Sequence, residues 1–333
     1  MNHLSRRALL AGLGSLAAYG LAGCQHATDR GALRLGYFPN VTHAPGLVGV
    51  SSGRFREALA GIGFETHAFN AGPEAMGALL AGALDMLYVG PVPAVTGYLR
   101  TRRRGLKIVS GVASGGASLI VRPAARITGP RDLEGKTLAT PQLGNSQDLS
   151  LRAYLAAHGL GAQEWGGSVA VTPMRNALIL QQFRRGLIDG AWVPEPWASR
   201  LEREAGGHQL LDERSLWPRG QFAATVLVAR GRYLGEAREN VARLVAAHRR
   251  EVLALRRDAA RAPETIARAL AAAGAPIAMP LLTQALSRVA FTLDPLIETV
   301  APVCAAGQRL GLLPEGEIAG LADPEMVNVG GTV

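Results

Sequence analysis

Residues 33–46 read LRLGYFPNVTHAPG, and this stretch indicates the architecture of the chain. The apolar run Leu33–Phe38 is typical of a strand, and Asn40–Ala44 follows it as a loop. Pro45 then opens a helical pattern over Gly46–Ala60, because proline lacks the N–H that the first helical turn leaves unpaired anyway. A strand, a short loop and a helix in this order predict the repeating unit of an α/β protein.

The same alternation continues as far as Gly231. Further strands are predicted at Phe64–Phe69, Asp85–Val89, Lys107–Ala113, Ala117–Arg122, Thr137–Thr140, Ser168–Thr172, Gly190–Val193 and Ala224–Ala229. Further helices are predicted at Glu74–Ala81, Val92–Leu99, Gln147–His158, Ala177–Arg185 and Trp197–Ala205. Their expected starting residues are Pro73, Pro91, Ser146, Asn176 and Pro196.

After Gly231 the pattern changes to helices with no strands between them. The predicted helices there are Glu236–Arg257, Pro263–Ala273, Met279–Val289 and Pro295–Leu310. The chain therefore predicts a mixed sheet followed by a helical segment, and no linker or repeat divides it.

Polar or glycine-rich loops follow several of the predicted strands, and this is where ligands bind in open α/β sheets. A helix N-terminus in such a loop attracts an anion by about 0.3–1 kcal/mol. The loops are Asn40–Pro45, Ala71–Pro73, Gly90–Pro93, Ser114–Gly116, Gln142–Gln147 and Pro194–Trp197. Each alone is an ordinary turn, but their shared context indicates a binding site.

Motifs for cofactor or catalytic chemistry are missing from the sequence. No glycine-rich dinucleotide fingerprint, Walker motif or nucleophile elbow occurs, and the seven histidines are scattered without metal-ligand spacing. We therefore expect no cofactor and no metal. His43 lies in the first loop, where a hydrogen-bonding wall residue or a ligand contact fits better than a metal ligand.

The first 24 residues resemble an export signal. Arg6 and Arg7 precede the apolar run Ala8–Leu21, which is short for a bilayer span of roughly 20 residues, and the segment closes with Leu21–Cys24. This ending is similar to the cleavage box of bacterial lipoproteins. We therefore expect a signal peptide at 1–23, lipidation of Cys24 and a tether at 24–30. Twin-arginine and general secretory export both remain open.

Charge and cysteine content agree with an exported, lipid-anchored protein. The formal charge is +9, and removing the two leader arginines leaves +7. Anionic lipid headgroups or small anions are the expected partners of this field, and no nucleic acid is expected. Cys304 would have no cysteine partner once Cys24 carries lipid, so the core and not a disulfide must hold the fold.

Several motifs together resemble the periplasmic substrate-binding proteins for aliphatic sulfonates, taurine and nitrate, which share a fold with thiamine-pyrimidine synthases. The resemblance covers essentially the whole exported part. The motifs are Leu33–Asn40 through Gly46, Phe69–Glu74 to Asp85, Leu133–Lys136 with Gly144–Ser146, and Leu187–Trp192 to Trp197.

The resemblance implies a type II periplasmic-binding fold, with two α/β lobes, a hinge of two crossing strands and a C-terminal helical segment. Lobe 1 would comprise 31–116 plus 221–333, and lobe 2 would comprise 117–220. Ligand would bind between lobes that close on it. The contacts implied by position are Thr42, His43, Gly72, Pro91, Val92, Ser114, Gly115, Asn145, Ser146, Gln147, Glu195, Trp197 and Gln221.

Two of these residues keep alternative interpretations. Glu195 either contacts an amino group or other donor of the ligand, or it caps the helix at Trp197 or pairs across the hinge. Trp197 is either an apolar wall for an organic tail or a core residue. Trp192 and Cys304 are expected to be core residues.

The function implied is that of a monomeric, lipid-anchored binding subunit of an ABC importer, facing the periplasm or cell exterior. Its partners would be a small organic anion, a permease and an ATPase. An aliphatic sulfonate is the leading ligand, and nitrate, bicarbonate, an aromatic acid or a thiamine-pyrimidine precursor are alternatives. A pyrimidine-synthase-like enzyme is disfavoured, because those enzymes carry a cysteine cluster and the exported part has Cys304 alone. A sensory or structural lipoprotein that keeps the fold without transport also remains open.

Overall fold

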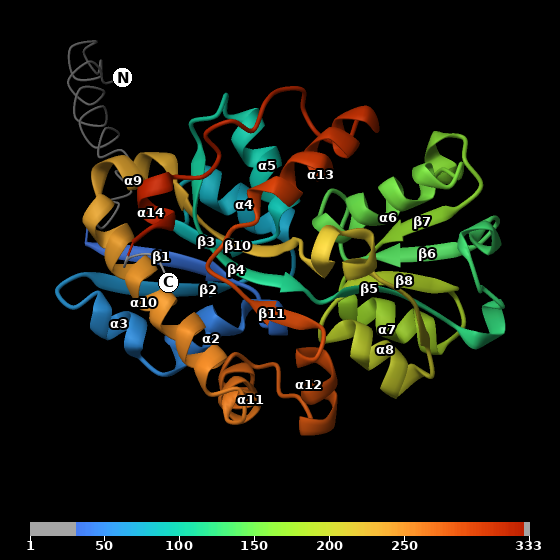
Figure 1. Ribbon diagram of the computed structural model, residues 1–333, viewed down its shortest axis with the longest axis horizontal. Coiled ribbons are helices and arrows are strands. Elements are labelled where there is room, and N and C mark those ends of the chain that lie inside the picture. Colours follow the sequence, from blue (N-terminus) through green and yellow to red (C-terminus); the bar gives the residue numbers. More distant parts are fainter. Residues whose placement is uncertain (1–30, 330–333) are drawn as a thin grey trace, which may run out of the picture. The chain divides into compact units, whose positions relative to one another are not determined.

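A computed structural model describes residues 31–329, and two separate β-sheets organise them. The first sheet has six strands in the order β11-β4-β10-β3-β1-β2 (Figure 1). Strand β3 pairs parallel with β1 and antiparallel with β10, so the sheet is mixed as predicted. Its strands are β1 (Ala32–Tyr37), β2 (Gly63–Ala68), β3 (Met86–Val89), β4 (Leu106–Gly115), β10 (Ala223–Arg230) and β11 (Val289–Phe291).

The second sheet has five strands in the order β7-β6-β8-β5-β9. They are β5 (Ala117–Val121), β6 (Thr137–Thr140), β7 (Ala170–Pro173), β8 (Gly190–Pro194) and β9 (His208–Asp212). The chain passes into this sheet between β4 and β5 and returns between β9 and β10. We call the part built on the first sheet the first lobe and the part built on the second sheet the second lobe.

Helices accompany both sheets (Figure 1). In the first lobe these are α2 (Ala44–Ser51), α3 (Arg54–Ala58), α4 (Gly72–Leu80) and α5 (Pro91–Arg100). In the second lobe they are α6 (Ser146–Ala157), α7 (Asn176–Arg184) and α8 (Trp197–Ala205). After β10 come α9 (Gly231–Glu236), α10 (Arg238–Arg257), α11 (Ala262–Ala272), α12 (Met279–Leu286), α13 (Ile297–Arg309) and α14 (Pro324–Val327).

Each lobe buries apolar side chains between its sheet and its helices. Leu33, Leu35 and Tyr88 belong to one cluster in the first lobe, where helices α2, α10 and α11 also contribute residues. In the second lobe Trp192 and Leu119 are fully buried with residues of α6. Trp192 and Cys304 are both buried, as the sequence predicts.

Three expectations about secondary structure are wrong. The helix predicted at Gly46–Ala60 is two helices, because Gly53 adopts a left-handed backbone (φ 78°) that no helix continues through. The C-terminal segment contains a strand, β11, and Val289 belongs to it and not to a helix. Strand β9 was not predicted, and it pairs with β5 at the edge of the second sheet.

Within residues 31–329, no helix is both long enough and apolar enough to cross a bilayer. Cys24 and the predicted signal peptide lie outside the described residues.

Candidate functional site

The carboxyl ends of strands from both sheets meet at one small pocket, which we call the anion pocket. Its wall residues follow β1, β2 and β3 in the first lobe and β6, β7 and β8 in the second, joined by the start of β10. This is the location at which open α/β sheets bind ligands. The lining residues are Phe38, Asn40, Thr42, His43, Asn70, Ala71, Gly72, Gly90, Pro93, Pro141, Asn145, Ser146, Gln147, Asn176, Pro194, Ala224 and Thr225.

Six of the residues expected at the site line this pocket together, although they come from both lobes. They are Thr42, His43, Gly72, Asn145, Ser146 and Gln147. Two more, Pro91 and Val92, line a narrow neck next to it, whose wall also contains Ser146 and Gln147. The helices α4, α5, α6 and α7 all begin at these walls, so their N-terminal N–H groups lie near the pocket.

A buried carboxylate holds the loop that leads into α6. Asp148 accepts hydrogen bonds from Thr140 Oγ1 (2.9 Å) and Gly144 N (3.0 Å), and Arg152 Nε donates to it at 3.1 Å. Asn145 caps the helix, because its Oδ1 accepts from Asp148 N at 2.8 Å. Ser146 is the first residue of α6, as expected, and the cap is the preceding Asn145. The Ser146 hydroxyl therefore remains available to the pocket.

The Ser146 hydroxyl joins the two lobes directly. Val92 N, in the first turn of α5, donates to Ser146 Oγ at 3.4 Å. Gly90 also lies against this hydroxyl, since a Cβ placed on Gly90 would lie 2.5 Å from Ser146 Oγ. The absence of a side chain at Gly90 thus permits the lobes to approach each other at this point.

His43 is buried and neutral. Phe38 N donates to His43 Nδ1 at 3.3 Å, so the ring hydrogen sits on Nε2. Burial lowers the pKa of His43 to about 3, which excludes an imidazolium at ordinary pH. The residue can offer the pocket a neutral N–H donor but no positive charge.

The walls of the anion pocket contain no charged side chain among the described residues. Hydroxyls, amides, one neutral imidazole and helix N-termini are its polar groups. The volume accessible to water in the pocket is about 40 Å³, which holds a few water molecules. The pocket therefore suits a chemical group of a few heavy atoms. Such an environment can hold a compact anion without a counter-cation, or a small neutral polar group.

Glu195 lies outside this pocket and is fully buried. Its oxygens accept from Ser199 N (3.1 Å) and Ser199 Oγ (3.0 Å), and Arg288 Nη1 contacts Oε1 at 2.9 Å. Burial raises the pKa of Glu195, while the bonds from Arg288 and Ser199 act in the opposite direction. Both carboxylate oxygens of Glu195 thus have partners within the protein. The contacts match the interpretation in which Glu195 caps α8 and pairs across the hinge.

Two other expected contacts also lie elsewhere. Trp197 is part-buried at the start of α8, where the Arg200 guanidinium lies 4.9 Å from its ring centroid. Gly115 has φ 78° where the chain leaves β4, so a β-carbon there would be strained and would also meet Arg288 O at 2.5 Å. Neither residue lines the anion pocket.

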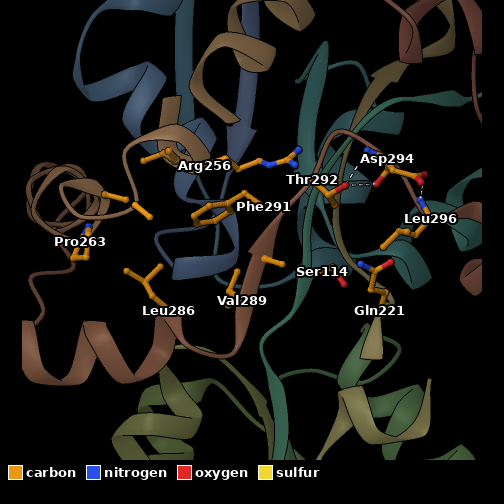
Figure 2. Close-up of a pocket in the computed structure, with 14 residues that line it drawn as sticks. Ser114, Gln221, Arg256, Pro263, Leu286, Val289, Phe291, Thr292, Asp294 and Leu296 are labelled. Atoms are coloured by element: carbon orange, nitrogen blue, oxygen red, sulfur yellow. Dashed lines mark hydrogen bonds between the residues drawn. The ribbon is translucent and has the colours of Figure 1, made fainter. Parts of the chain in front are cut away.

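Ser114 and Gln221 face a second, larger cavity of about 600 Å³ (Figure 2). It is bordered mainly by the C-terminal part of the chain, including Phe291, Leu286 and Asp294. Ser114 Oγ also accepts from Phe222 N at 3.1 Å, which ties β4 to the start of β10. Of the thirteen expected contacts, six therefore line the anion pocket, two the neck and two the second cavity, while Gly115, Glu195 and Trp197 line none of these three.

Sequence reasoning missed several residues that line the anion pocket. Asn70 and Asn40 lie in loops or motifs that the sequence singled out, so their position after a strand was an available signal. Asn176 was expected only as a helix start, yet its Oδ1 is buried without a hydrogen-bond partner in the described structure. Thr225 and Ala224 come from the returning strand β10, which no local pattern connects with a binding loop.

The two sheets, the double crossing and the pocket between them define a two-lobed binding-protein fold. The chain belongs to the NMT1-like family, whose model matches residues 26–271.

A curated relative and two solved structures show what the chain is similar to. A Brucella abortus protein that carries a provisional binding-protein name is 28% identical over 187 residues, or 56% of this chain. The match spans 55% of that relative, so the chain covers about half the length of the curated relatives it matches.

Among solved structures, the alkanesulfonate-binding protein SsuA of Xanthomonas axonopodis pv. citri, bound to MOPS, has a TM-score of 0.72 at 21% identity. The similarity covers 87% of this chain and 96% of that one. The periplasmic nitrate-binding protein NrtA of Synechocystis has a TM-score of 0.74 at 14% identity, covering 89% of this chain and 87% of the other. At these identities the likeness concerns the fold.

Proposed function

We propose that this protein is the substrate-binding component of an ABC importer and captures a small organic anion between its lobes. The observation that carries the proposal is the anion pocket, where six strands from two sheets end around one compact, uncharged set of donors. A site divided between two lobes favours closure when ligand is bound, because ligand contacts with both lobes stabilise the closed arrangement. A permease can then distinguish loaded from unloaded protein by shape.

An aliphatic sulfonate is the proposed ligand. Its three oxygens can accept from several donors at once, and the pocket offers the Ser146 hydroxyl and the His43 N–H beside helix N-termini. The Thr42 hydroxyl, which donates to Asn40 Oδ1 at 3.0 Å, joins them once it turns to the ligand. The structural relatives include proteins named for alkanesulfonate and for nitrate binding, and these names support the choice of a compact oxyanion as ligand. Nitrate, bicarbonate, an aromatic acid and a thiamine-pyrimidine precursor are the competing ligands.

The proposed setting is outside the cytoplasm. Export through the leader at 1–23 and lipid on Cys24 would tether a monomeric protein to the membrane beside a permease and its ATPase. We propose no catalytic step, because the pocket walls present no acid, base pair or nucleophile with an activating partner.

Titration calorimetry of the natively purified protein tests this function. Propanesulfonate should bind with one site per monomer, and nitrate, bicarbonate, benzoate and hydroxymethylpyrimidine serve as competitors of other classes. Ligand should also raise the unfolding midpoint by mass action. The sulfonate assignment fails if a competitor binds and propanesulfonate does not. The binding function fails if none of the five gives heat or a thermal shift at millimolar concentration.

A further inference from the structure

The anion pocket continues into a longer cleft between the lobes. The neck beyond it is lined by Val92 of α5, by Ser146 and Gln147 of α6, and by Thr299 and Val300 of α13. Beyond the neck lies a wider space between α6 and α13, which we call the apolar chamber. The neck and the chamber adjoin, because four residues line both. The residues common to neck and chamber are Ser150, Glu213, Trp217 and Val303.

The polarity of the cleft changes along helix α6. Ser146 lies at the anion pocket, Ser150 at the neck and Tyr154 and Ala157 at the chamber, so these residues follow helical spacing along one face. At 1.5 Å per residue the distance from Ser146 to Ala157 is about 16 Å. One side of the cleft therefore changes from hydroxyl to apolar over the length of a substituted alkyl chain.

The chamber is large and almost entirely apolar. It offers about 270 Å³, compared with about 40 Å³ in the anion pocket and about 10 Å³ in the neck. Helices α6 and α13 pack against each other beside it (Figure 1). Its apolar walls are Leu149, Ala153, Leu216, Pro302, Val303 and Ala306. A ring-sized apolar group fits there, whereas the neck has room for about one water molecule and must widen to admit an alkyl chain.

Glu213 lies where the neck joins the chamber, and its side chain has no cationic partner there. Only 4% of the residue is exposed, Ser150 Oγ donates to Oε1 at 2.8 Å, and Trp192 Nε1 donates to Oε2 at 2.7 Å. Both donors are neutral, and among residues 31–329 no lysine or arginine lines the neck or the chamber. Burial without a cationic partner disfavours the ionised form of Glu213, so a ligand ammonium group, which stabilises that form, would complement it at this position.

We propose that the ligand is an amino-substituted organic sulfonate with an apolar ring or chain: the sulfonate in the anion pocket, the ammonium group at Glu213 and the apolar group in the chamber. This proposal rests on the proposed function, which it narrows. The spacing supports it, because Ser146 and Ser150 are one helical turn apart, about 6 Å, which a short alkyl spacer covers.

Three probes test the proposal by titration calorimetry. Propanesulfonate contains only the head group and spacer. Cyclohexylbutanesulfonate adds a ring, and N-cyclohexyl-aminopropanesulfonate has the same shape with one methylene replaced by a protonated amine. We expect the ring to tighten binding about tenfold through apolar burial, and the amine to tighten it about tenfold more.

Two variants assign these gains to their residues. Glu213→Gln should reduce the difference in affinity between the two ring probes to about twofold or less, with the affinity for propanesulfonate measured in both proteins as the reference. Ala306→Phe fills the chamber and should remove the gain from the ring, whereas Ala301→Phe, on an exposed position of the same helix, should retain it.

Each outcome decides a different point. Equal affinity for all three probes overturns the proposal and leaves the proposed function standing. A gain from the ring that is the same for amine and methylene, unaffected by Glu213→Gln, overturns the role of Glu213. If propanesulfonate and both ring probes fail to bind, the proposed function fails and this proposal with it.

Discussion

At the residue scale, Ser146 and Thr42 have the most direct expected role in binding. Replacing both with alanine removes two hydroxyls from the anion pocket, including the one that accepts from Val92 N. We expect the double variant to bind propanesulfonate about tenfold or more weakly, at about 1 kcal/mol per lost hydrogen bond. Calorimetry measures this, with Thr172→Ala on β7 as the control, because its hydroxyl donates to Leu138 O away from the pocket. Unchanged affinity in the double variant would remove both hydroxyls from the site.

Glu213 predicts a pH dependence of stability. Burial, and to a lesser degree the neighbouring Asp212, raises its pKa from the ordinary glutamate value of 4.5 to about 7, while bonds from Ser150 and Trp192 partly oppose this rise. The folded protein thus binds more protons than the unfolded chain between these pH values. The contribution of protonated Glu213 to stability is complete below about pH 4.5 and is lost as pH rises through about 7.

The comparison of wild type with Glu213→Gln isolates this effect. As pH rises from about 4.5 to about 7, the wild type should lose roughly 3 kcal/mol of its free energy of unfolding relative to Glu213→Gln. His43 and His248 have lowered pKa values, about 3 and about 4, and so destabilise the fold towards acid, but they do so equally in both proteins. A pH-independent difference, measured by denaturant titration, would contradict the assignment.

Residue-scale prediction from sequence succeeded where a side chain follows a strand. Thr42, His43 and Asn145 could be expected at the site because their loops lie between a strand and a helix. Glu213 and Arg288 could not, since each lies in an ordinary local sequence and acquires its role from a distant partner. The partners are Trp192 for Glu213 and Glu195 for Arg288.

At the scale of elements, the contact between α8 and the end of α12 is held by charge. Arg288 binds Glu195 (2.9 Å) and Glu202 (3.0 Å), and Gln284 donates to Glu202 at 2.6 Å. Arg203 donates to Gln284 in the same cluster. This cluster joins the second lobe to the C-terminal helices of the first.

Removing Arg288 should therefore destabilise the protein. Arg288→Met leaves Glu195 buried without its cation, and we expect a loss of about 3 kcal/mol in the free energy of unfolding. Adding Glu195→Gln to this variant should recover most of the loss. The control is Arg232→Met, whose partner Glu236 is exposed, and it should have no measurable effect. Equal behaviour of the two arginine variants in denaturant titrations would show that the buried pair contributes little.

The elements themselves were largely predictable, because their periodicity is strong. Buried strands such as β3 and β8 contain continuous apolar runs, and helices α5 and α6 begin at recognisable signals. Strand β11 has only three residues between helices, and it exists because β4 provides a pairing edge far away in sequence. Such a strand depends on tertiary structure and leaves no local pattern.

At the scale of the whole described region, we expect the proposed closure of the lobes to depend on Gly90. Its φ of −67° is open to any residue, so alanine adds no backbone strain, but the new Cβ would lie 2.5 Å from Ser146 Oγ. Gly90→Ala should therefore oppose closure, weaken propanesulfonate binding about tenfold and abolish the decrease in radius of gyration that the ligand causes. Small-angle X-ray scattering with and without ligand measures the latter.

Two variants support this interpretation. Gly77→Ala lies on α4 with nothing within 4 Å of its new Cβ, so it should retain both closure and affinity. Ser146→Ala combined with Gly90→Ala removes the clashing oxygen and should restore compaction, even where affinity stays low. Normal compaction in Gly90→Ala alone would show that the lobes close by another path.

The position of β10 has a consequence for the order in which the molecule is assembled during synthesis. This strand sits between β3 and β4, yet it is made only after the entire second sheet has been made. Until then β3 presents an open edge and β4 has no partner strand, because both of its neighbours, β10 and β11, come later in the sequence. The inserted lobe can therefore mature first, while the first lobe waits for β10 and is the part most exposed to misassembly.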